Sequence, residues 1–185
     1  KLNFTIRGGI DAHNDQREFR RAFSTNRNPF GSYREDNVRF LETNFDYLLT
    51  YKDALNENWA YTLSAGGNRF DQEIEYTYAT AAQLAVPGVY SIANSRVPIT
   101  GNSEYFDRRI NSLYGIANFE YKDILYFDLN YRNDWSSTLP EDNNSFGYYS
   151  AGVSYVLSNM LSLPEKISYL QVRFNAASVG NDTDP

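Results

Sequence analysis

Apolar and polar side chains alternate along residues 109–135, in two stretches that only two residues separate. From Leu113 to Tyr121 every odd position is apolar or small, whereas polar side chains gather at the even positions. A period of two residues is typical of a β-strand with one apolar and one polar face. The joint Lys122-Asp123 is short enough to predict that the two stretches form one β-hairpin.

The second stretch of this hairpin has two chemically distinct faces. One face carries the side chains of Leu125, Phe127, Leu129 and Tyr131, and the other those of Asp128, Asn130, Arg132 and Asp134. Each stretch has ~10 residues or more, which exceeds the ~5–6 residues of a typical globular strand and approaches the ~9–11 that cross a bilayer. Long strands with an apolar face and a polar face are typical of a membrane barrel that has lipid outside and water inside.

A helix is the alternative for the first stretch, because five apolar residues recur there at helical spacing: Ile110, Leu113, Tyr114, Ala117 and Tyr121. However, Gly115 interrupts this stretch, and β-forming residues dominate 124–131. A joint of two residues also leaves no room to cap two helices. The strand interpretation is therefore favoured.

The same alternation recurs in two further pairs of stretches. Residues 41–51 and 59–69 predict a second hairpin, and residues 147–157 and 167–179 predict a third. The apolar positions of these hairpins share one phase and are expected to face lipid or detergent. This expectation covers Phe45, Tyr47, Leu49, Leu125, Phe127, Leu129, Val153, Tyr155, Leu170 and Val172.

Connection lengths alternate along the chain. The joints at 52–58, 122–123 and 158–166 are short, whereas the segments 8–38, 71–107 and 136–146 are mostly longer and rich in polar residues. Short periplasmic turns and long outer loops are typical of outer-membrane barrels. Within 71–107, the alternation that begins at Asp71, Glu73 and Glu75 predicts a strand that extends above the membrane.

With a first strand at 2–7, the sequence predicts seven strands in one antiparallel meander, and thus an all-β fold. No linker or shift in composition divides the chain, so residues 1–185 are expected to form a single segment. Bacterial single-chain barrels have an even number of strands. We therefore expect the segment to belong to a larger barrel, because seven strands leave two open edges that other strands must pair.

Composition argues against several classes of function. A net charge of −6 argues against a nucleic-acid partner, since phosphate binding needs a basic surface. The chain has no cysteine, and its one histidine, His13, falls in an expected polar loop, so neither thiol chemistry nor an ordinary zinc site is expected. The sequence contains no run of ~18 apolar residues, so no transmembrane helix is expected. We expect no enzyme activity, no catalytic residue, no metal site and no cofactor.

Two groups of residues are candidates for function. The side chains expected to line a wet lumen, and hence a substrate path, are Asp128, Asn130, Arg132, Asp134 and Arg173. The aromatic residues expected at the membrane interfaces are Trp59, Tyr131, Trp135 and Tyr155. For Trp135, sugar stacking is the alternative role.

Two acidic groups could offer oxygen ligands to calcium. They are Glu141-Asp142 and the pair Asp182 and Asp184. Neither matches the spacing of an EF-hand loop, so exposed loop acids are the favoured interpretation.

Several strings of residues carry a resemblance to a known family. They read RINSLYG at 109–115, YKD at 121–123, RNDWSSTLP at 132–140, VPGVYS at 86–91 and VGNDTDP at 179–185. Together they closely resemble the SusC/RagA family of TonB-dependent outer-membrane transporters. The first 80 residues agree with that family by pattern more than by motif.

The resemblance implies a plugged barrel of ~22 strands in the bacterial outer membrane. It also implies a SusD-like surface lipoprotein as partner, import of an oligosaccharide or peptide, and energy from the TonB complex through a plug that this segment does not contain. Two alternatives stay open at this point. One is a passive porin or another outer-membrane barrel, and the other is a soluble β-sandwich that binds carbohydrate.

Overall fold

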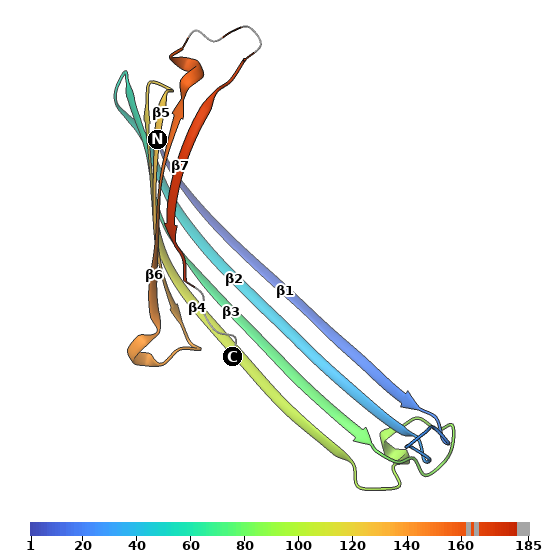
Figure 1. The fold of residues 1–185 in the computed structure, drawn as a ribbon. Coiled ribbons are helices and arrows are strands. Elements are labelled where there is room, and N and C mark those ends of the chain that lie inside the picture. The colour runs from blue at the N-terminus through green and yellow to red at the C-terminus, as the bar shows by residue number, and fades with distance from the viewer. Residues whose placement is uncertain (162–163, 165–166, 181–185) are drawn as a thin grey trace. The chain divides into compact units, whose positions relative to one another are not determined.

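The computed structural model describes residues 1–161, 164 and 167–180. These residues form one antiparallel sheet of seven strands in the order β1-β2-β3-β4-β5-β6-β7. The strands are β1 (Leu2–Arg21), β2 (Ser32–Asn56), β3 (Trp59–Ala81), β4 (Thr100–Tyr121), β5 (Leu125–Ser136), β6 (Ser145–Val156) and β7 (Gln171–Ser178) (Figure 1). Three short 3₁₀ helices lie between them: η1 (Ile92–Asn94), η2 (Glu141–Asn143) and η3 (Leu157–Asn159).

This order confirms the all-β meander that the sequence predicts. Residues 109–121 lie within β4, so the helical alternative for this stretch is wrong. A β-sandwich needs two facing sheets, and the strands of the described residues belong to one. No helix among the described residues is long and apolar enough to cross a membrane.

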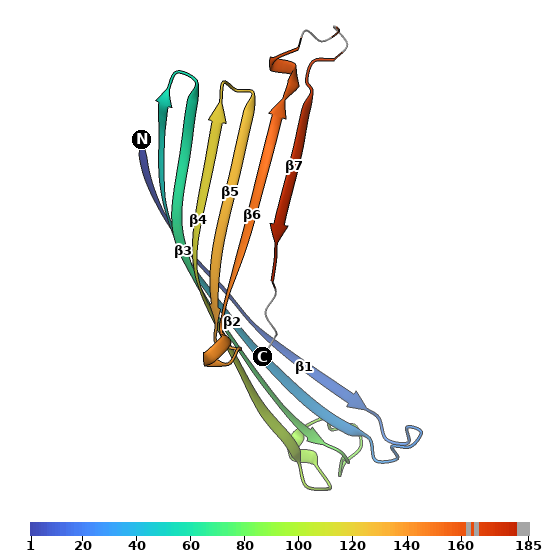
Figure 2. The same cartoon turned by 60° about the vertical axis from the view of Figure 1, so that its left-hand side comes forward.

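The chain divides into two compact units. Unit 1 comprises Lys1–Gly9, Asn44–Phe70 and Arg109–Pro185, and unit 2 comprises Ile10–Thr43 and Asp71–Arg108. Unit 1 contains all of β5, β6 and β7, which lie side by side with the last part of β4 (Figure 2). The two units are described separately below.

The expectation of long loops at 8–38 and 71–107 is wrong. Most of these residues extend β1, β2, β3 and β4, and the loops are reduced to 22–31 and 82–99. The extensions carry polar residues at both odd and even positions, so they lack the apolar alternation that identifies a strand in sequence. The alternation from Asp71 to Glu75 does continue β3, as expected.

His13 illustrates the same correction. It lies in β1 rather than in a loop, and its ring stacks on Phe40 with a centroid distance of 4.7 Å. The first expected turn is also shorter than 52–58, because β2 runs on to Asn56. At the other end of the chain, β7 begins at Gln171 rather than at residue 167.

The register of the β4–β5 hairpin assigns each side chain to a face. Tyr114 pairs with Arg132, and Asn118 pairs with Asp128. The turn residues Lys122 and Asp123 have φ angles of 52° and 56°, the left-handed conformation that a two-residue type I′ turn needs. Twelve consecutive pairs join the two strands, which confirms the hairpin.

We call the two sides of this part of the sheet the polar face and the apolar face. The polar face carries Ser112, Tyr114, Asn118, Asp128, Asn130, Arg132, Asp134, Tyr148, Ser150, Ser154, Arg173 and Asn175. The apolar face carries Leu113, Ala117, Phe119, Tyr121, Leu125, Phe127, Leu129, Tyr131, Tyr149, Val153, Tyr155, Val172 and Phe174.

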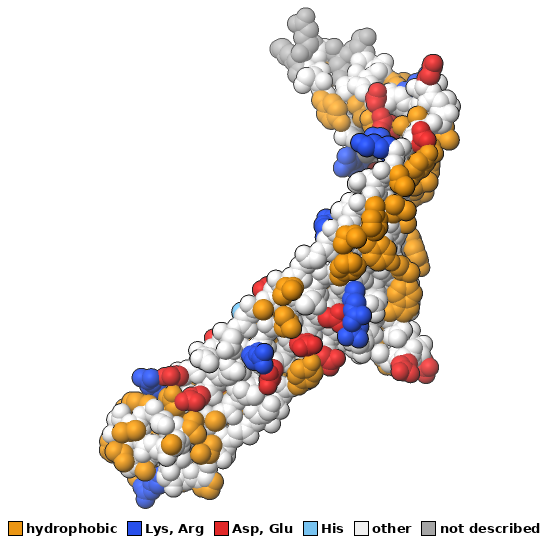
Figure 3. Space-filling model, turned by 180° about the vertical axis from the view of Figure 1, so that it is seen from behind, with side chains coloured by type: hydrophobic (Ala, Val, Ile, Leu, Met, Phe, Trp, Pro, Cys, Tyr) orange, Lys and Arg blue, Asp and Glu red, His pale blue; other side chains and the backbone are white. Residues whose placement is uncertain are grey.

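The apolar face is largely exposed, unlike the apolar side chains that form the core of a water-soluble protein. On the apolar face Leu129 is 49% exposed and Phe174 is 69% exposed. On the polar face Ser112, Asp134 and Ser154 are buried, whereas Asn130, Arg132 and Arg173 are exposed. Figure 3 shows one side of the molecule, on which hydrophobic side chains gather at the surface. None of the ten residues expected to face lipid is buried in a core.

A conventional hydrophobic core is found in unit 2. Tyr33, Ala81 and Leu84 are buried there, and the partly buried side chains of Phe23, Tyr90 and Ile92 pack against them. The loops 22–31 and 82–99 are thus joined by apolar contacts, and the backbone amide of Leu84 also donates to the Phe30 carbonyl.

Candidate functional site

A series of polar contacts runs across the strands of unit 1, from β1 to β5. The Tyr114 hydroxyl on β4 donates to Asp46 Oδ2 on β2 over 2.6 Å. Arg7 Nε on β1 lies 3.3 Å from the other carboxylate oxygen, Asp46 Oδ1. That oxygen is buried and makes no hydrogen bond, so Arg7 neutralises the carboxylate through charge alone.

Arg132 continues this series on β5. Its Nε donates to Asp134 Oδ1 over 2.7 Å, and its Nη2 donates to Ser112 Oγ over 2.8 Å. The guanidinium carbon also lies 5.9 Å from the centre of the Tyr114 ring, within the range of a cation–π contact. Because Asp134 is only 8% exposed, the paired guanidinium stabilises a carboxylate that is largely withdrawn from water.

A pair of glycines on β3 makes room for two tyrosines. A Cβ atom on Gly66 would lie 2.7 Å from Tyr114 Cζ and 2.5 Å from the Tyr47 carbonyl oxygen. A Cβ atom on Gly67 would lie 2.5 Å from the hydroxyl oxygen of Tyr47. Tyr114 can reach Asp46 across β3 because Gly66 leaves its path open.

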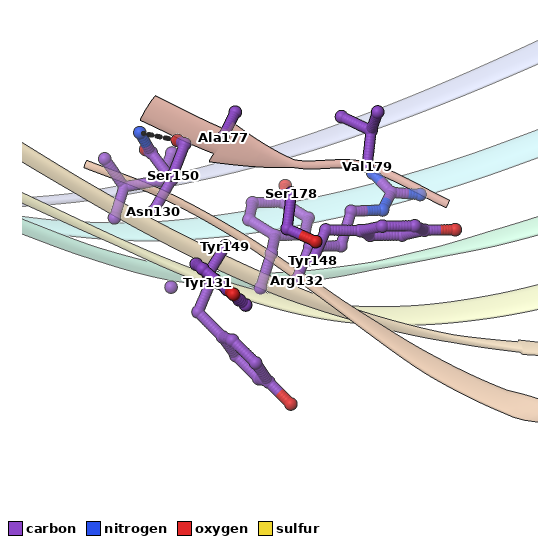
Figure 4. Close-up of a pocket in the computed structure, with 12 residues that line it drawn as sticks. Asn130, Tyr131, Arg132, Tyr148, Tyr149, Ser150, Ala177, Ser178 and Val179 are labelled. Atoms are coloured by element: carbon purple, nitrogen blue, oxygen red, sulfur yellow. Dashed lines mark hydrogen bonds between the residues drawn. The ribbon is translucent and has the colours of Figure 1, made fainter. Parts of the chain in front are cut away.

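A cavity of about 470 Å³ is lined by the middle of β4, β5 and β6 and by the end of β7 (Figure 4). Arg132 and Tyr148 lie on one side of the sheet, whereas Tyr131 points away from them. Asn130 Nδ2 donates to Ser150 Oγ over 3.0 Å at one end of the cavity. The lining thus offers a guanidinium, amides and hydroxyls next to aromatic rings.

A second cavity, of about 400 Å³, lies toward the turn end of the same strands and contains Asp128 and Arg173. Asn118 Nδ2 donates to Asp128 Oδ1 over 2.6 Å, and Arg173 Nε donates to Ser154 Oγ over 2.9 Å. Both charged groups therefore contact neutral partners, and they remain able to attract a charged group that enters the cavity.

This arrangement is suited to reversible binding of a polar solute. Its groups are hydrogen-bond donors, acceptors and charges of both signs, all held by neighbours in the sheet. Among the described residues no group of three or more His, Cys, Asp or Glu side chains could hold a metal ion. The candidate calcium ligands Asp182 and Asp184 lie outside the described residues.

Aromatic side chains mark both ends of the apolar face. At the turn end the rings of Trp59 and Tyr121 lie 4.8 Å apart, and the Tyr155 hydroxyl donates to Met160 Sδ. At the other end lie Tyr131, which is 55% exposed, and Trp135. Trp135 and Leu125 are ten residues apart on β5, or about 33 Å at ~3.3 Å per residue. A tilt of ~40° reduces this to about the ~25 Å of a barrel's apolar band.

The structure brings together the predicted substrate-path residues Asp128, Asn130, Arg132, Asp134 and Arg173 on the polar face. The four predicted interfacial aromatics divide between the two ends of the apolar face. That these faces meet a lumen and a membrane stays a prediction. Sequence reasoning assigned no role to Arg7, Tyr114 or Gly66. The strand pattern shows which face of its strand each of these residues occupies. The contacts between β1, β2, β3 and β4, however, depend on a register that the pattern does not specify.

The fold is similar to that of solved transporter structures. The structure of the RagAB peptide transporter matches with a TM-score of 0.84 at 19% identity, over 94% of this chain and 20% of that chain. The RagAB peptide importer in its 'open-open' state matches with a TM-score of 0.77 at 21% identity, over 95% and 20% of the two chains. Its 'closed-closed' state matches with a TM-score of 0.79 at 21% identity, over 98% and 21%.

No protein-family model matches the sequence, and no curated protein matches it either. This chain spans about a fifth of the length of the transporter chains that it matches. At these identities the similarity establishes the fold. The chain therefore has the fold of a barrel segment of the RagAB peptide transporter.

Proposed function

We propose that this chain is part of the barrel of an outer-membrane nutrient importer of the SusC/RagA type. The observation that carries the proposal is the two-faced sheet of unit 1, with its exposed apolar face and its hydrogen-bonded polar face. The shared fold with the RagAB peptide transporter supports the same assignment. In this assignment the apolar face contacts the lipid bilayer, and Trp59, Tyr131, Trp135 and Tyr155 lie at its two interfaces.

The polar face lines the path of the substrate. Arg132, Asp134, Asp128 and Arg173 present charges of both signs along it. A peptide carries charges of both signs, whereas a neutral oligosaccharide carries none, so these residues favour a peptide as cargo. The groups hold and release the cargo without covalent chemistry, and the protein acts as a transporter rather than as an enzyme.

Three further parts of the proposal rest on the family resemblance. A SusD-like surface lipoprotein captures the substrate, a plug closes the barrel, and the TonB complex supplies energy through that plug. The alternative of a passive porin differs in one respect that can be measured. A porin conducts solutes without TonB, whereas the proposed importer depends on it.

The test is uptake by cells that express the full-length transporter. Fluorescently labelled oligopeptides and malto-oligosaccharides are supplied to cells with and without an intact TonB complex, and a strain that lacks the transporter gene provides the background. We expect peptide uptake that disappears when TonB is removed. Uptake that persists without TonB would indicate a porin, and uptake of oligosaccharide alone would overturn the peptide assignment.

A further inference from the structure

The loop 82–99 in unit 2 ends in an apolar turn that the proposed transport path does not use. Val86 is 52% exposed and Val89 is 47% exposed, with Pro87 and Gly88 between them. Gly88 has a φ of 77°, and Pro followed by a residue with positive φ is the pattern of a type II turn. Two valine side chains are thus presented to solvent on a short turn.

Asn94 fixes this turn through its side chain. Its Oδ1 accepts from the Val86 amide over 3.1 Å, and its Nδ2 donates to the carbonyls of Val86 and Val89 over 2.9 and 2.7 Å. The backbone of Asn94 closes the loop as well, because its carbonyl accepts from the Ala85 amide over 2.9 Å. One side chain therefore holds both ends of the turn.

The base of the loop is anchored in the core of unit 2. Leu84 is fully buried, and the ring of Tyr90 lies 6.4 Å from the ring of Tyr33. The backbone amide of Arg96 donates to the Gln83 carbonyl, which closes the loop beyond the turn. The exposed valines are consequently held in place before any partner arrives, and a preorganised contact loses less entropy on binding.

The charge around the turn indicates what it binds. No charged residue occurs between Glu75 and Arg96, in a chain of which 22% is charged. Two cations of unit 2 contact aromatic rings, since the guanidinium of Arg96 lies 4.2 Å from the centre of the Phe30 ring and that of Arg20 lies 5.6 Å from the centre of the Tyr90 ring. Anionic lipid head groups attract basic side chains, whereas the centre of a protein interface is depleted of charge.

We infer that the turn Val86–Val89 is a docking point that inserts into an apolar recess on the surface lipoprotein partner. The inference rests on the proposed function, because that function supplies the partner. A turn of four residues is too small to form a stable interface alone, which buries ~1,200–2,000 Å². It acts as one anchor within a larger contact, in the way that a few buried side chains provide most of the affinity of an interface.

The experiment uses the full-length transporter in lipid nanodiscs and the purified lipoprotein encoded beside it, without its lipid anchor. The dissociation constant is measured for the wild type, for the double variant Val86→Asp/Val89→Asp and for Ile99→Asp. Ile99 is the matched control, because it is 51% exposed in the same unit but lies outside the turn. We expect the double variant to weaken binding about tenfold or more, and Ile99→Asp to change it less than twofold.

A second variant tests preorganisation separately. Asn94→Ala leaves both valines in place but removes the three side-chain hydrogen bonds of the turn. We expect it to weaken binding by an intermediate factor. The amount of each variant in the outer membrane shows whether it assembles. If Asn94→Ala does not assemble, the double variant still decides the test.

The outcomes separate this inference from the proposed function. If the wild type binds the lipoprotein and the double variant binds equally well, the inference is overturned and the transporter assignment stands. If the wild type does not bind, or no such lipoprotein is encoded, the partner proposal fails together with the inference. A double variant that instead loses affinity only for lipopolysaccharide vesicles would assign the turn to a lipid surface and overturn the inference.

Discussion

Leu129 and Asn130 are neighbours in sequence, but their side chains lie on opposite faces of β5. An arginine on the lipid side near the bilayer midplane costs ~2–4 kcal/mol. We therefore expect Leu129→Arg to reduce the amount of transporter in the outer membrane, and Asn130→Arg to leave it unchanged. Immunoblots of purified outer membranes measure both. Equal amounts of the two variants would show that the faces of β5 have been assigned the wrong way round.

Gly66 leaves room for the side chain of Tyr114, and a larger residue at this position tests that role. An added methyl group would meet Tyr114 at 2.7 Å and the backbone oxygen of Tyr47 at 2.5 Å, and overpacking of this kind costs ~1–3 kcal/mol. We expect Gly66→Ala to lower the temperature at which the full-length barrel unfolds on gel electrophoresis. Gly115→Ala is the control, because its nearest contact would be a normal 3.9 Å. An unchanged temperature for Gly66→Ala would mean that Tyr114 does not lie over β3.

Tyr33 makes the stability of unit 2 depend on pH. Burial raises the pKa of its hydroxyl to about 12, and hydrogen bonds to Glu35 and Glu18 add to the rise. The pKa in an unfolded chain is about 10. Since the folded pKa is the higher one, the stabilisation is complete below pH ~10 and is lost as pH rises toward 12.

The measurement is resistance of loops 22–31 and 82–99 to protease as a function of pH, with a protease that is active under alkaline conditions. We expect the wild type to become sensitive between pH 10 and 12. The variant Tyr33→Phe should lack this rise in protease sensitivity between pH 10 and 12, because its ring cannot ionise. A variant whose sensitivity rises as steeply as that of the wild type would assign the transition to another group.

At the scale of single elements, the backbone conformation of the β4–β5 turn restricts which residues it can accept. Lys122 and Asp123 both have positive φ, a conformation that costs an ordinary L-residue ~1–2 kcal/mol and is worst for a β-branched one. We expect Lys122→Val to destabilise the hairpin and Asp123→Gly to stabilise it, as judged by the unfolding temperature of the barrel. Glu57→Val is the control, since Glu57 lies in the β2–β3 turn without positive φ. If Lys122→Val and Glu57→Val behaved alike, the type I′ assignment would be wrong.

The elements differ in how well the sequence predicts them. The sequence pattern predicts β5 to within a residue at each end, because its apolar face is continuous from Leu125 to Tyr131. The pattern does not predict the second half of β1, because residues such as Arg17 and Glu18 interrupt the apolar alternation. Such extensions are specified by hydrogen bonds to neighbouring strands, and backbone hydrogen bonds leave no mark on side-chain identity.

The site shows the same limit. Alternate residues of a strand lie on the same face of the sheet, so the sequence predicts that Asp128, Asn130 and Arg132 share a face. The Arg7–Asp46–Tyr114 contacts could not, because they depend on the relative registers of four strands. A shift of the register by one residue moves every side chain to the other face, and only the packed sheet specifies which register is formed.

At the scale of the whole molecule, the proposed path should respond to charge. Arg132→Gln keeps an amide that can donate to Asp134 and Ser112 but removes the positive charge. We expect a several-fold lower uptake of acidic peptides relative to neutral ones, measured per transporter in the outer membrane, because loss of the guanidinium also leaves the Asp134 carboxylate without its counter-charge. Arg109→Gln is the control, because Arg109 occupies an odd position of β4, and by alternation along the strand its side chain lies on the side of the sheet opposite to Arg132. Equal effects of the two variants would indicate that the polar face does not select cargo.

The strand order β1 to β7 also determines how such a chain can be assembled. Each strand from β2 to β7 pairs with the strand before it in sequence, so a new strand meets a partner that is already in place. Loop-closure entropy is then small at each step, and local contacts of this kind are the ones that form quickly. In the proposed importer, the chain could be inserted into the membrane two strands at a time, and only the final seam between the first and last strands of the complete barrel would have to wait for the whole polypeptide.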